Sequence, residues 1–246
     1  MRAEKRREAA AAGGDSGRGT RRPLPPGAVR GVLFDCNGTM VYDEAFHTEA
    51  WKVFLRDKLG HDVDESEFHT WVHGVNGDVT VRHYLGEDLE GEELHALMEE
   101  KEVIYRRLAR ESGAFVLAPG LEAFLDLLAK RGIPAAIGTA AADGNVRFFF
   151  EELPLARWFT MDRVIHNDGT FPGKPAPDIY LRGAAAIGVP IGKCLLFEDA
   201  LAGIEAGLRA GAGKICGVAS MLTPEELLSR GADAAVFDYR GAEALL

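Results

Sequence analysis

Three short apolar runs that end abruptly on polar side chains constrain the fold of this chain more than any other feature. They are residues 32–34, followed by Asp35; residues 133–137, followed by Gly138 and Thr139; and residues 194–197, followed by Glu198 and Asp199. Such runs, alternating with segments of helical periodicity and joined by short connections, are typical of repeated βα units. The sequence therefore predicts an α/β fold with a doubly wound parallel sheet. Ligands of such sheets bind beyond the carboxyl ends of the strands, where these polar side chains would meet.

A long segment with a different pattern interrupts this alternation. Residues 43–113 contain no β-branched runs, and their apolar residues, such as Trp51 and Phe54, recur at helical spacing. We expect a helical insert here. The core domain is then expected to comprise residues 30–42 and 114–246, with the insert as a second domain.

The N-terminal segment, residues 1–29, is rich in Ala, Gly, Arg and Pro and is expected to form a disordered basic tail. It lacks the apolar stretch of a secretory signal, and no run in the chain reaches the roughly 18 apolar residues that span a bilayer. Residues 1–30 carry eight basic and three acidic residues in a chain of net charge −10, so the remainder is strongly acidic. We therefore expect neither nucleic acid nor a membrane as a partner.

The three cysteines give no sign of a disulfide framework or a zinc site. Cys36, Cys194 and Cys216 are odd in number, widely spaced and without a CxxC pair. A reducing compartment fits this pattern, and we expect a cytoplasmic monomer.

The polar residues at the predicted strand ends, together with Lys174, form a set suited to phosphoryl chemistry. Asp35, Glu198 and Asp199 would supply the oxygen ligands that Mg²⁺ prefers, with water and a substrate phosphate completing its shell. Carboxylates alone repel a phosphate dianion, whereas a metal ion and a lysine allow an aspartate to attack it in line. The expected intermediate is an aspartyl phosphate.

Four segments carry a resemblance to a known family. They are FDCNGT (34–39), IGTA (137–140), GKPAPDIY (173–180) and FEDALAGIEAG (197–207). Through them the chain from residue 30 onward resembles the haloacid dehalogenase superfamily, in the branch of β-phosphoglucomutase and small phosphosugar phosphatases. The resemblance implies a Rossmann-like core with an inserted helical cap, and a small phosphorylated metabolite as substrate.

The resemblance also implies roles for individual residues. Asp35 is expected to be the nucleophile, and Lys174 to offset the charge between nucleophile and phosphate. The expected Mg²⁺ ligands are Asp35, the backbone carbonyl of Asn37, Glu198 and Asp199. The residues expected to contact the phosphate or the rest of the substrate are Gly38, Thr139, Ala140, His47, His73 and Lys101. The cap is expected to close over the site and exclude water.

Asn37 departs from the family pattern, which has a second aspartate there as general acid and base. An amide cannot exchange a proton, and general acid–base catalysis contributes a factor of about 10²–10⁴, so slow turnover of ordinary esters is expected. The turnover of acyl phosphates should be reduced least, because their leaving oxygen needs no proton. Asn37→Asp is expected to raise the turnover of ordinary esters. Gly77 replaces an arginine of the mutase, and Ala141 and Ala142 replace residues that would bind a second phosphate. Mutase activity is therefore not expected.

Other interpretations of these features stay open. Asn37 is also consistent with a pseudoenzyme that binds a phosphorylated ligand or a partner. Phosphonate hydrolases likewise lack the second aspartate, but they need a cap lysine where this chain has Gly77. Lys101 and Arg106, predicted on one helix, can also be interpreted as part of a solvated charged face.

Overall fold

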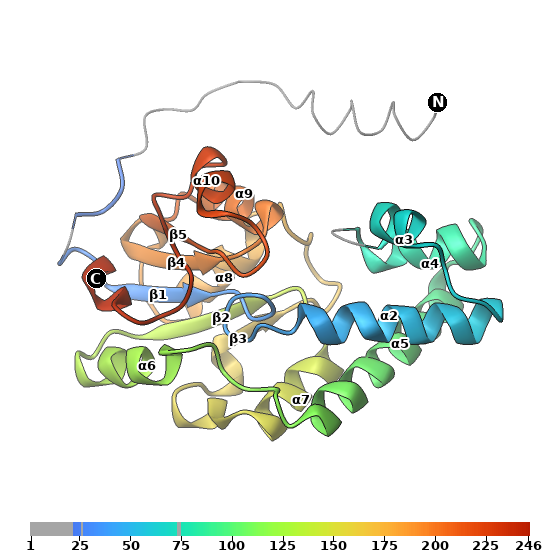
Figure 1. Cartoon of the computed structure of the whole chain (residues 1–246). Helices are drawn as coiled ribbons and strands as arrows, with labels where there is room; N and C mark the ends of the chain where they lie inside the picture. Colours follow the sequence, from blue (N-terminus) through green and yellow to red (C-terminus); the bar gives the residue numbers. More distant parts are fainter. Residues whose placement is uncertain (1–21, 26, 73–74) are drawn as a thin grey trace.

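A six-stranded parallel sheet forms the centre of the molecule (Figure 1), with strand order β3-β2-β1-β4-β5-β6. The computed structural model describes residues 22–25, 27–72 and 75–246. The strands are β1 (Gly31–Phe34), β2 (Ala135–Thr139), β3 (Val164–His166), β4 (Cys194–Glu198), β5 (Lys214–Val218) and β6 (Ala234–Val236). Because β1 pairs with β2 on one side and β4 on the other, the three polar strand ends lie next to one another.

Helices cover both faces of this sheet. They are α6 (Leu121–Lys130), α7 (Asp143–Glu152), α8 (Asp178–Ala186), α9 (Leu201–Ala210) and α10 (Pro224–Ser229), with short 3₁₀ segments at Pro154–Arg157, Met161–Arg163, Ile191–Lys193 and Ala242–Leu245. On β1, Phe34 belongs to the same core as Phe124 of α6. Its neighbour Leu33 belongs to the opposite core, with Tyr180 of α8. Adjacent strand residues thus alternate between two buried faces, and the predicted doubly wound α/β fold is confirmed.

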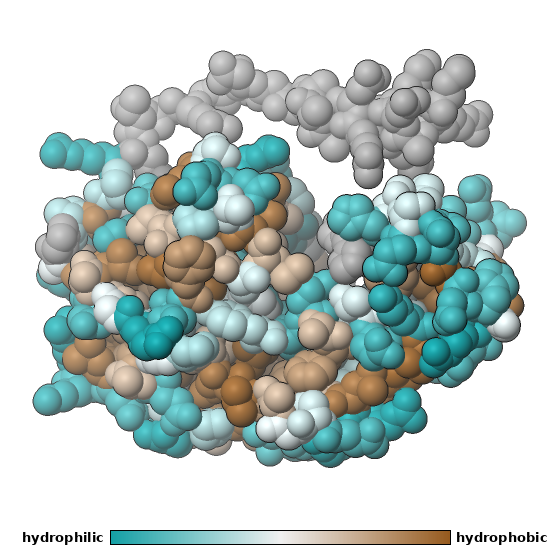
Figure 2. All heavy atoms as spheres, in the orientation of Figure 1, coloured by the Kyte–Doolittle hydropathy of each residue, from teal (hydrophilic) through white to brown (hydrophobic). Residues whose placement is uncertain are grey.

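The chain between β1 and α6 forms a group of helices beside the sheet, which we call the helical lobe (Figure 1). These helices are α2 (Glu44–Leu59), α3 (Glu65–Trp71), α4 (Gly77–Leu85) and α5 (Gly91–Ser112). They bury a small core of their own, which includes Trp51, Phe54 and Phe68. Most of the lobe's surface in the view of Figure 2 is hydrophilic. The long helix α5 contacts both α2 and α7, so it connects the lobe to the sheet's helices.

Most of the predicted tail lies outside the described residues. Its last residues contact the core: Leu24 N donates to Gly213 O at 2.9 Å, and Gly27 N donates to Leu246 O at 2.6 Å. Val29 is buried. Among the residues that are described, no helix is long and apolar enough to cross a membrane.

Candidate active site

The carboxyl ends of β1 and β4 hold a buried cluster of charged groups. Asp35 follows β1 and is 7% exposed, and Glu198 ends β4 and is 1% exposed. Lys174, from the loop before α8, donates to Asp35 Oδ1 and, at 2.6 Å, to Glu198 Oε1. Three residues predicted from distant segments of the sequence thus meet around one ammonium group.

Burial and charge shift the pKa values of this cluster. Burial raises the pKa of Asp35 to about 7; the Lys174 ammonium opposes this rise, and the Glu198 carboxylate adds to it. Burial alone would lower the pKa of Lys174, but the Asp35 and Glu198 carboxylates raise it well above its usual range. The lysine is therefore charged at neutral pH. Perturbed carboxyl groups of this kind are typical of catalytic sites.

Asp199 is a third carboxylate at this edge of the sheet. Its Oδ1 accepts a hydrogen bond from Thr39 Oγ1 at 3.0 Å. Burial, followed by the charges of Glu198 and Asp35, raises the pKa of Asp199 well above its usual value. Gly38 has φ +73°, and a Cβ there would overlap the Asp199 carboxylate. The close approach of Asp199 therefore requires glycine at position 38.

The donor set at this edge fits Mg²⁺. Asp35 and Asp199 disfavour each other's charge, and a divalent cation beside both would remove this repulsion. In the part of the chain that the structure describes, no group of three or more His, Cys, Asp or Glu side chains is arranged to hold a metal ion. Mg²⁺ does not need one, because it commonly uses one or two carboxylates together with water and a substrate phosphate.

Glu198 is held by protein donors on both of its oxygens. Oε1 accepts from Lys174 and, at 2.9 Å, from the Tyr180 hydroxyl, while Oε2 accepts from Ala200 N at 2.7 Å. Its neighbour Gly203, in the first turn of α9, leaves the space that the carboxylate occupies. In this arrangement Glu198 anchors Lys174.

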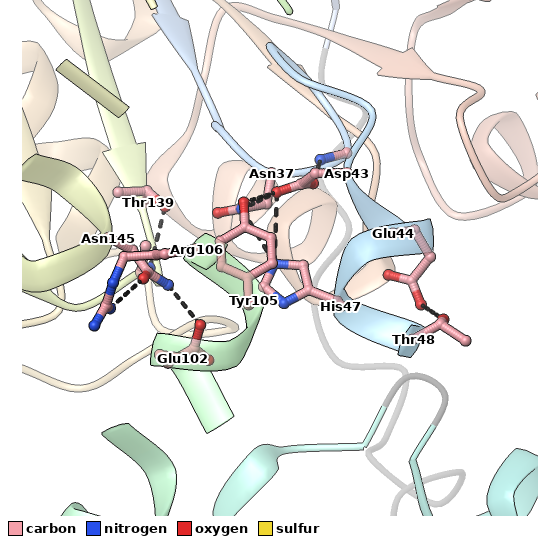
Figure 3. Close-up of polar contacts among 12 residues, drawn as sticks. Asn37, Asp43, Glu44, His47, Thr48, Glu102, Tyr105, Arg106, Thr139 and Asn145 are labelled. Carbon is pink, nitrogen blue, oxygen red and sulfur yellow. Dashed lines mark hydrogen bonds and ion pairs between the residues drawn. The ribbon is translucent and has the colours of Figure 1, made fainter. Parts of the chain in front are cut away.

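Thr139 ends β2, beside β1, and is fully buried. Its Oγ1 accepts a hydrogen bond from Ala141 N at 3.1 Å (Figure 3). Ala140, between these two residues, is exposed. The loop after β2 thus lies at the same sheet edge as Asp35, which is the position expected of a phosphate-binding loop.

Asp43 is a residue of the site that the sequence analysis did not identify. It is 1% exposed, and its Oδ2 accepts from Asn37 Nδ2 at 2.6 Å and from the Tyr105 hydroxyl at 2.5 Å. Burial would raise the pKa of Asp43, but hydrogen bonds from His47, Tyr105 and Asn37 hold it below its usual value. The spacing to His47, four residues further on, could have indicated Asp43, because residues four apart lie on one side of a helix.

His47 lies beside Asp43 (Figure 3), and Lys101 contacts His47. The His47 ring stacks on Tyr105 with centroids 3.9 Å apart. Lys101 Nζ lies 2.9 Å from His47 Nδ1 and 5.1 Å from the centre of the Trp51 ring. Lys101 is only 3% exposed, so its interpretation as part of a solvated face is wrong. His73, the third predicted substrate contact from this region, lies outside the described residues.

A second set of contacts joins the lobe to the start of α7. Arg106 Nη1 donates to Asn145 Oδ1 at 2.8 Å, and Asn145 Nδ2 donates to Glu102 Oε2 at 2.7 Å (Figure 3). The Arg106 side chain is 17% exposed and engaged by the core, so it too is not part of a solvated face. Helix α5 is therefore tied to the start of α7, a few residues after Thr139.

A cleft of about 240 Å³ lies beside the Asn37–Asp43 contact. Its walls include Asn37, Gly38, Asp43, His47 and Asp199. The cleft therefore gives a ligand access to the predicted metal-binding side of the site.

Comparisons with known proteins agree with this geometry. The family model of the haloacid dehalogenase-like hydrolases matches residues 29–211. Hexitol phosphatase A from Escherichia coli is 32% identical, over 79% of this chain and 86% of its own length. A β-phosphoglucomutase from Mycobacterium tuberculosis is 28% identical, over 87% of this chain and 91% of its own length.

A solved structure has a similar overall fold. The crystal structure of a haloacid dehalogenase hydrolase of family IA from Entamoeba histolytica is 36% identical, with a TM-score of 0.81. The match covers 87% of this chain and 95% of that one. The chain thus belongs to the haloacid dehalogenase-like hydrolases, in the branch that contains β-phosphoglucomutases and phosphosugar phosphatases.

Proposed function

We propose that this protein is a Mg²⁺-dependent phosphatase that removes the phosphate from a small phosphorylated metabolite through an aspartyl phosphate on Asp35. The observation that supports the proposal is the placement of the Lys174 ammonium between Asp35 and Glu198. Asp199 lies close enough to them that the charges of Glu198 and Asp35 raise the pKa of the Asp199 carboxyl. A nucleophilic carboxylate, a fixed cation and a second carboxylate are the parts that phosphoryl transfer needs.

In the first step, an Asp35 oxygen attacks phosphorus and the bond to the leaving oxygen breaks. Lys174 reduces the repulsion between the carboxylate and the phosphate, and Thr139 with the Ala140 amide holds the phosphoryl oxygens. Mg²⁺, held by Asp35, Asp199 and the Asn37 carbonyl, would neutralise phosphate charge. We assign to Glu198 the anchoring of Lys174, because both of its oxygens accept hydrogen bonds from protein donors.

In the second step, water attacks the phosphoryl group, which releases phosphate and restores the Asp35 carboxylate. Asn37 cannot take the proton of this water, so this step is expected to be slow. The first step also lacks a proton donor at position 37. Acyl phosphates, whose leaving oxygen departs as a stable anion, are therefore expected to react better than alkyl esters.

The helical lobe is proposed to act as the cap of this site. Its residue His47 lies beside Asn37 and lines the cleft, so a ligand in the cleft would contact both the lobe and the core, with Lys101 behind His47. The relative named for hexitol phosphates supports a small phosphorylated polyol or sugar as substrate.

A panel of acyl phosphates, alkyl phosphates and phosphonates, assayed with Mg²⁺ and with EDTA, tests this function. Wild type should release phosphate from acyl phosphates only with Mg²⁺, and Asp35→Ala should lower this rate by at least about 10³-fold, as expected when a nucleophile is removed. Asp57→Ala, which removes an exposed aspartate of α2, is the matched control and should retain the wild-type rate. Activity that survives Asp35→Ala contradicts the proposal. Binding of a phosphorylated ligand without turnover would identify a pseudoenzyme instead.

A further inference from the structure

The side chains of Asn37 and Asp43 form one of the shortest hydrogen bonds of the site. Asn37 Nδ2 lies 2.6 Å from Asp43 Oδ2, and both side chains line the cleft. A carboxylate accepts hydrogen bonds and does not donate them, so the Asn37 atom at this contact has to be the amide nitrogen. The amide oxygen of Asn37 is then the atom turned away from Asp43.

Asp43 is fixed by several donors from different elements. Besides Asn37, the Tyr105 hydroxyl of α5 donates to Oδ2 at 2.5 Å, and Gly38 N donates to Oδ1 at 3.3 Å. His47 Nε2 lies 3.5 Å from Oδ2. Since the Lys101 ammonium can only donate, His47 Nδ1 accepts and the ring proton sits on Nε2, toward Asp43.

We propose that Asp43 is a positioning residue that determines which group position 37 can carry. The two positions together hold one carboxylate and one amide, with the carboxylate at 43. Asp43 holds the Asn37 amide in one orientation, and the donors around Asp43 keep this carboxylate in place.

An aspartate at position 37 would be incompatible with this arrangement. In Asn37→Asp, two buried carboxyl groups would face each other across the present 2.6 Å contact, so they either repel each other or one of them has to take up a proton at neutral pH. A buried pair of like charges is strongly destabilising. Asn37→Asp alone is therefore not expected to restore the missing acid–base group, contrary to the expectation from the sequence.

Exchanging the two side chains should avoid this conflict. In the double variant Asn37→Asp/Asp43→Asn, the amide of residue 43 can donate to the carboxylate of residue 37 across the same contact. The carboxylate then stands at position 37 with a donor beside it. The effect on turnover rests on the proposed function, whereas the pairing itself does not.

The test is a double-mutant cycle of wild type, Asn37→Asp, Asp43→Asn and the double variant, beginning with thermal stability in EDTA. Asn37→Asp should lower the Tm by about 5–10 °C when Asp43 is present, the range expected for an uncompensated buried charge. In the Asp43→Asn background the same change should shift the Tm by less than about 2 °C, since the repulsion is absent.

A control substitution tests whether the coupling is specific to this contact. Ile204 of α9 is buried in the core that also contains Leu33 and Leu196. Ile204→Val removes one buried carbon and changes no charge or hydrogen bond. It should lower the Tm by the same amount whether residue 43 is Asp or Asn.

Turnover with Mg²⁺ gives the second readout of the cycle. The double variant should raise kcat for an alkyl phosphate about 10²-fold over wild type, the usual contribution of general acid–base catalysis, with KM little changed. Asn37→Asp alone should raise it far less.

The outcomes separate this inference from the proposed function. Additive Tm effects, or a gain in kcat from Asn37→Asp alone that equals the gain of the double variant, would overturn the role of Asp43. Coupled Tm values with no turnover in any variant would support the pairing while contradicting the phosphatase. Additive Tm values together with Asp35-dependent turnover would support the phosphatase while contradicting the pairing.

Discussion

At the scale of single residues, burial of the proposed nucleophile Asp35 lowers the stability of the fold. Asp35 is 7% exposed, and its pKa is raised to about 7, with burial as the main cause. A carboxyl whose pKa is higher in the folded than in the unfolded state binds its proton more tightly when folded. Without metal, the ionised side chain therefore destabilises the fold increasingly as the pH rises from about 4 to about 7.

Asp35→Asn should therefore stabilise the metal-free protein. We expect its Tm to exceed that of wild type by about 5–10 °C at pH 8, because a pKa shift of this size corresponds to a few kcal/mol and each kcal/mol to a few degrees. The difference should shrink as the pH falls toward 5, where the wild-type carboxyl takes up its proton. Thermal melts in EDTA across this range measure it. Equal melting temperatures at every pH, or a gap that widens in acid, would contradict the assignment.

At the scale of elements, the end of β4 and the first turn of α9 work together. Glu198 ends the strand, and a Cβ on Gly203 would overlap its carboxylate. Helix propensity favours alanine over glycine by about 1 kcal/mol, whereas overpacking costs about 1–3 kcal/mol. The clash should therefore outweigh the gain.

Gly203→Ala is accordingly expected to lower both stability and turnover, since displacement of Glu198 also displaces Lys174. The free energy of unfolding should fall by up to about 2 kcal/mol, the difference between the two opposing effects. Ala202→Ser, at the exposed neighbouring position of α9, is the control and should change it by less than about 0.5 kcal/mol. Denaturant unfolding of both variants measures this. A more stable Gly203→Ala protein would show that Glu198 is not confined as described.

Some of these elements could be predicted from the sequence and others could not. The strands that end on Asp35 and Glu198 were predictable because short apolar runs stop abruptly at charged groups. Strand β3, Val164–His166, was not predicted because only two of its residues are apolar. Asp43 was not predicted as a site residue because an aspartate at the start of a helix is ordinarily an N-cap. In the structure its side chain makes no cap hydrogen bond and accepts one from Asn37.

At the scale of the whole molecule, the site lies where lobe and core meet. The core supplies Asp35, Lys174 and Asp199, and the lobe supplies Asp43, His47 and Lys101. The sequence indicated the two parts through their different periodicities, but the contacts between them depend on side-chain positions in three dimensions. The hydrogen bond from Arg106 of α5 to Asn145 of α7 is one such contact that periodicity does not reveal.

The central claim is that Asp35 carries the phosphoryl group during turnover. Its most direct test is a rapid acid quench of the protein with Mg²⁺ and a radiolabelled acyl phosphate, followed by peptide mapping. Because Asn37 is expected to slow hydrolysis of the proposed intermediate, the label should accumulate on the peptide that contains Asp35 and be absent in Asp35→Ala. Phosphate release without label on that peptide, at a rate unchanged in Asp35→Ala, would contradict the account.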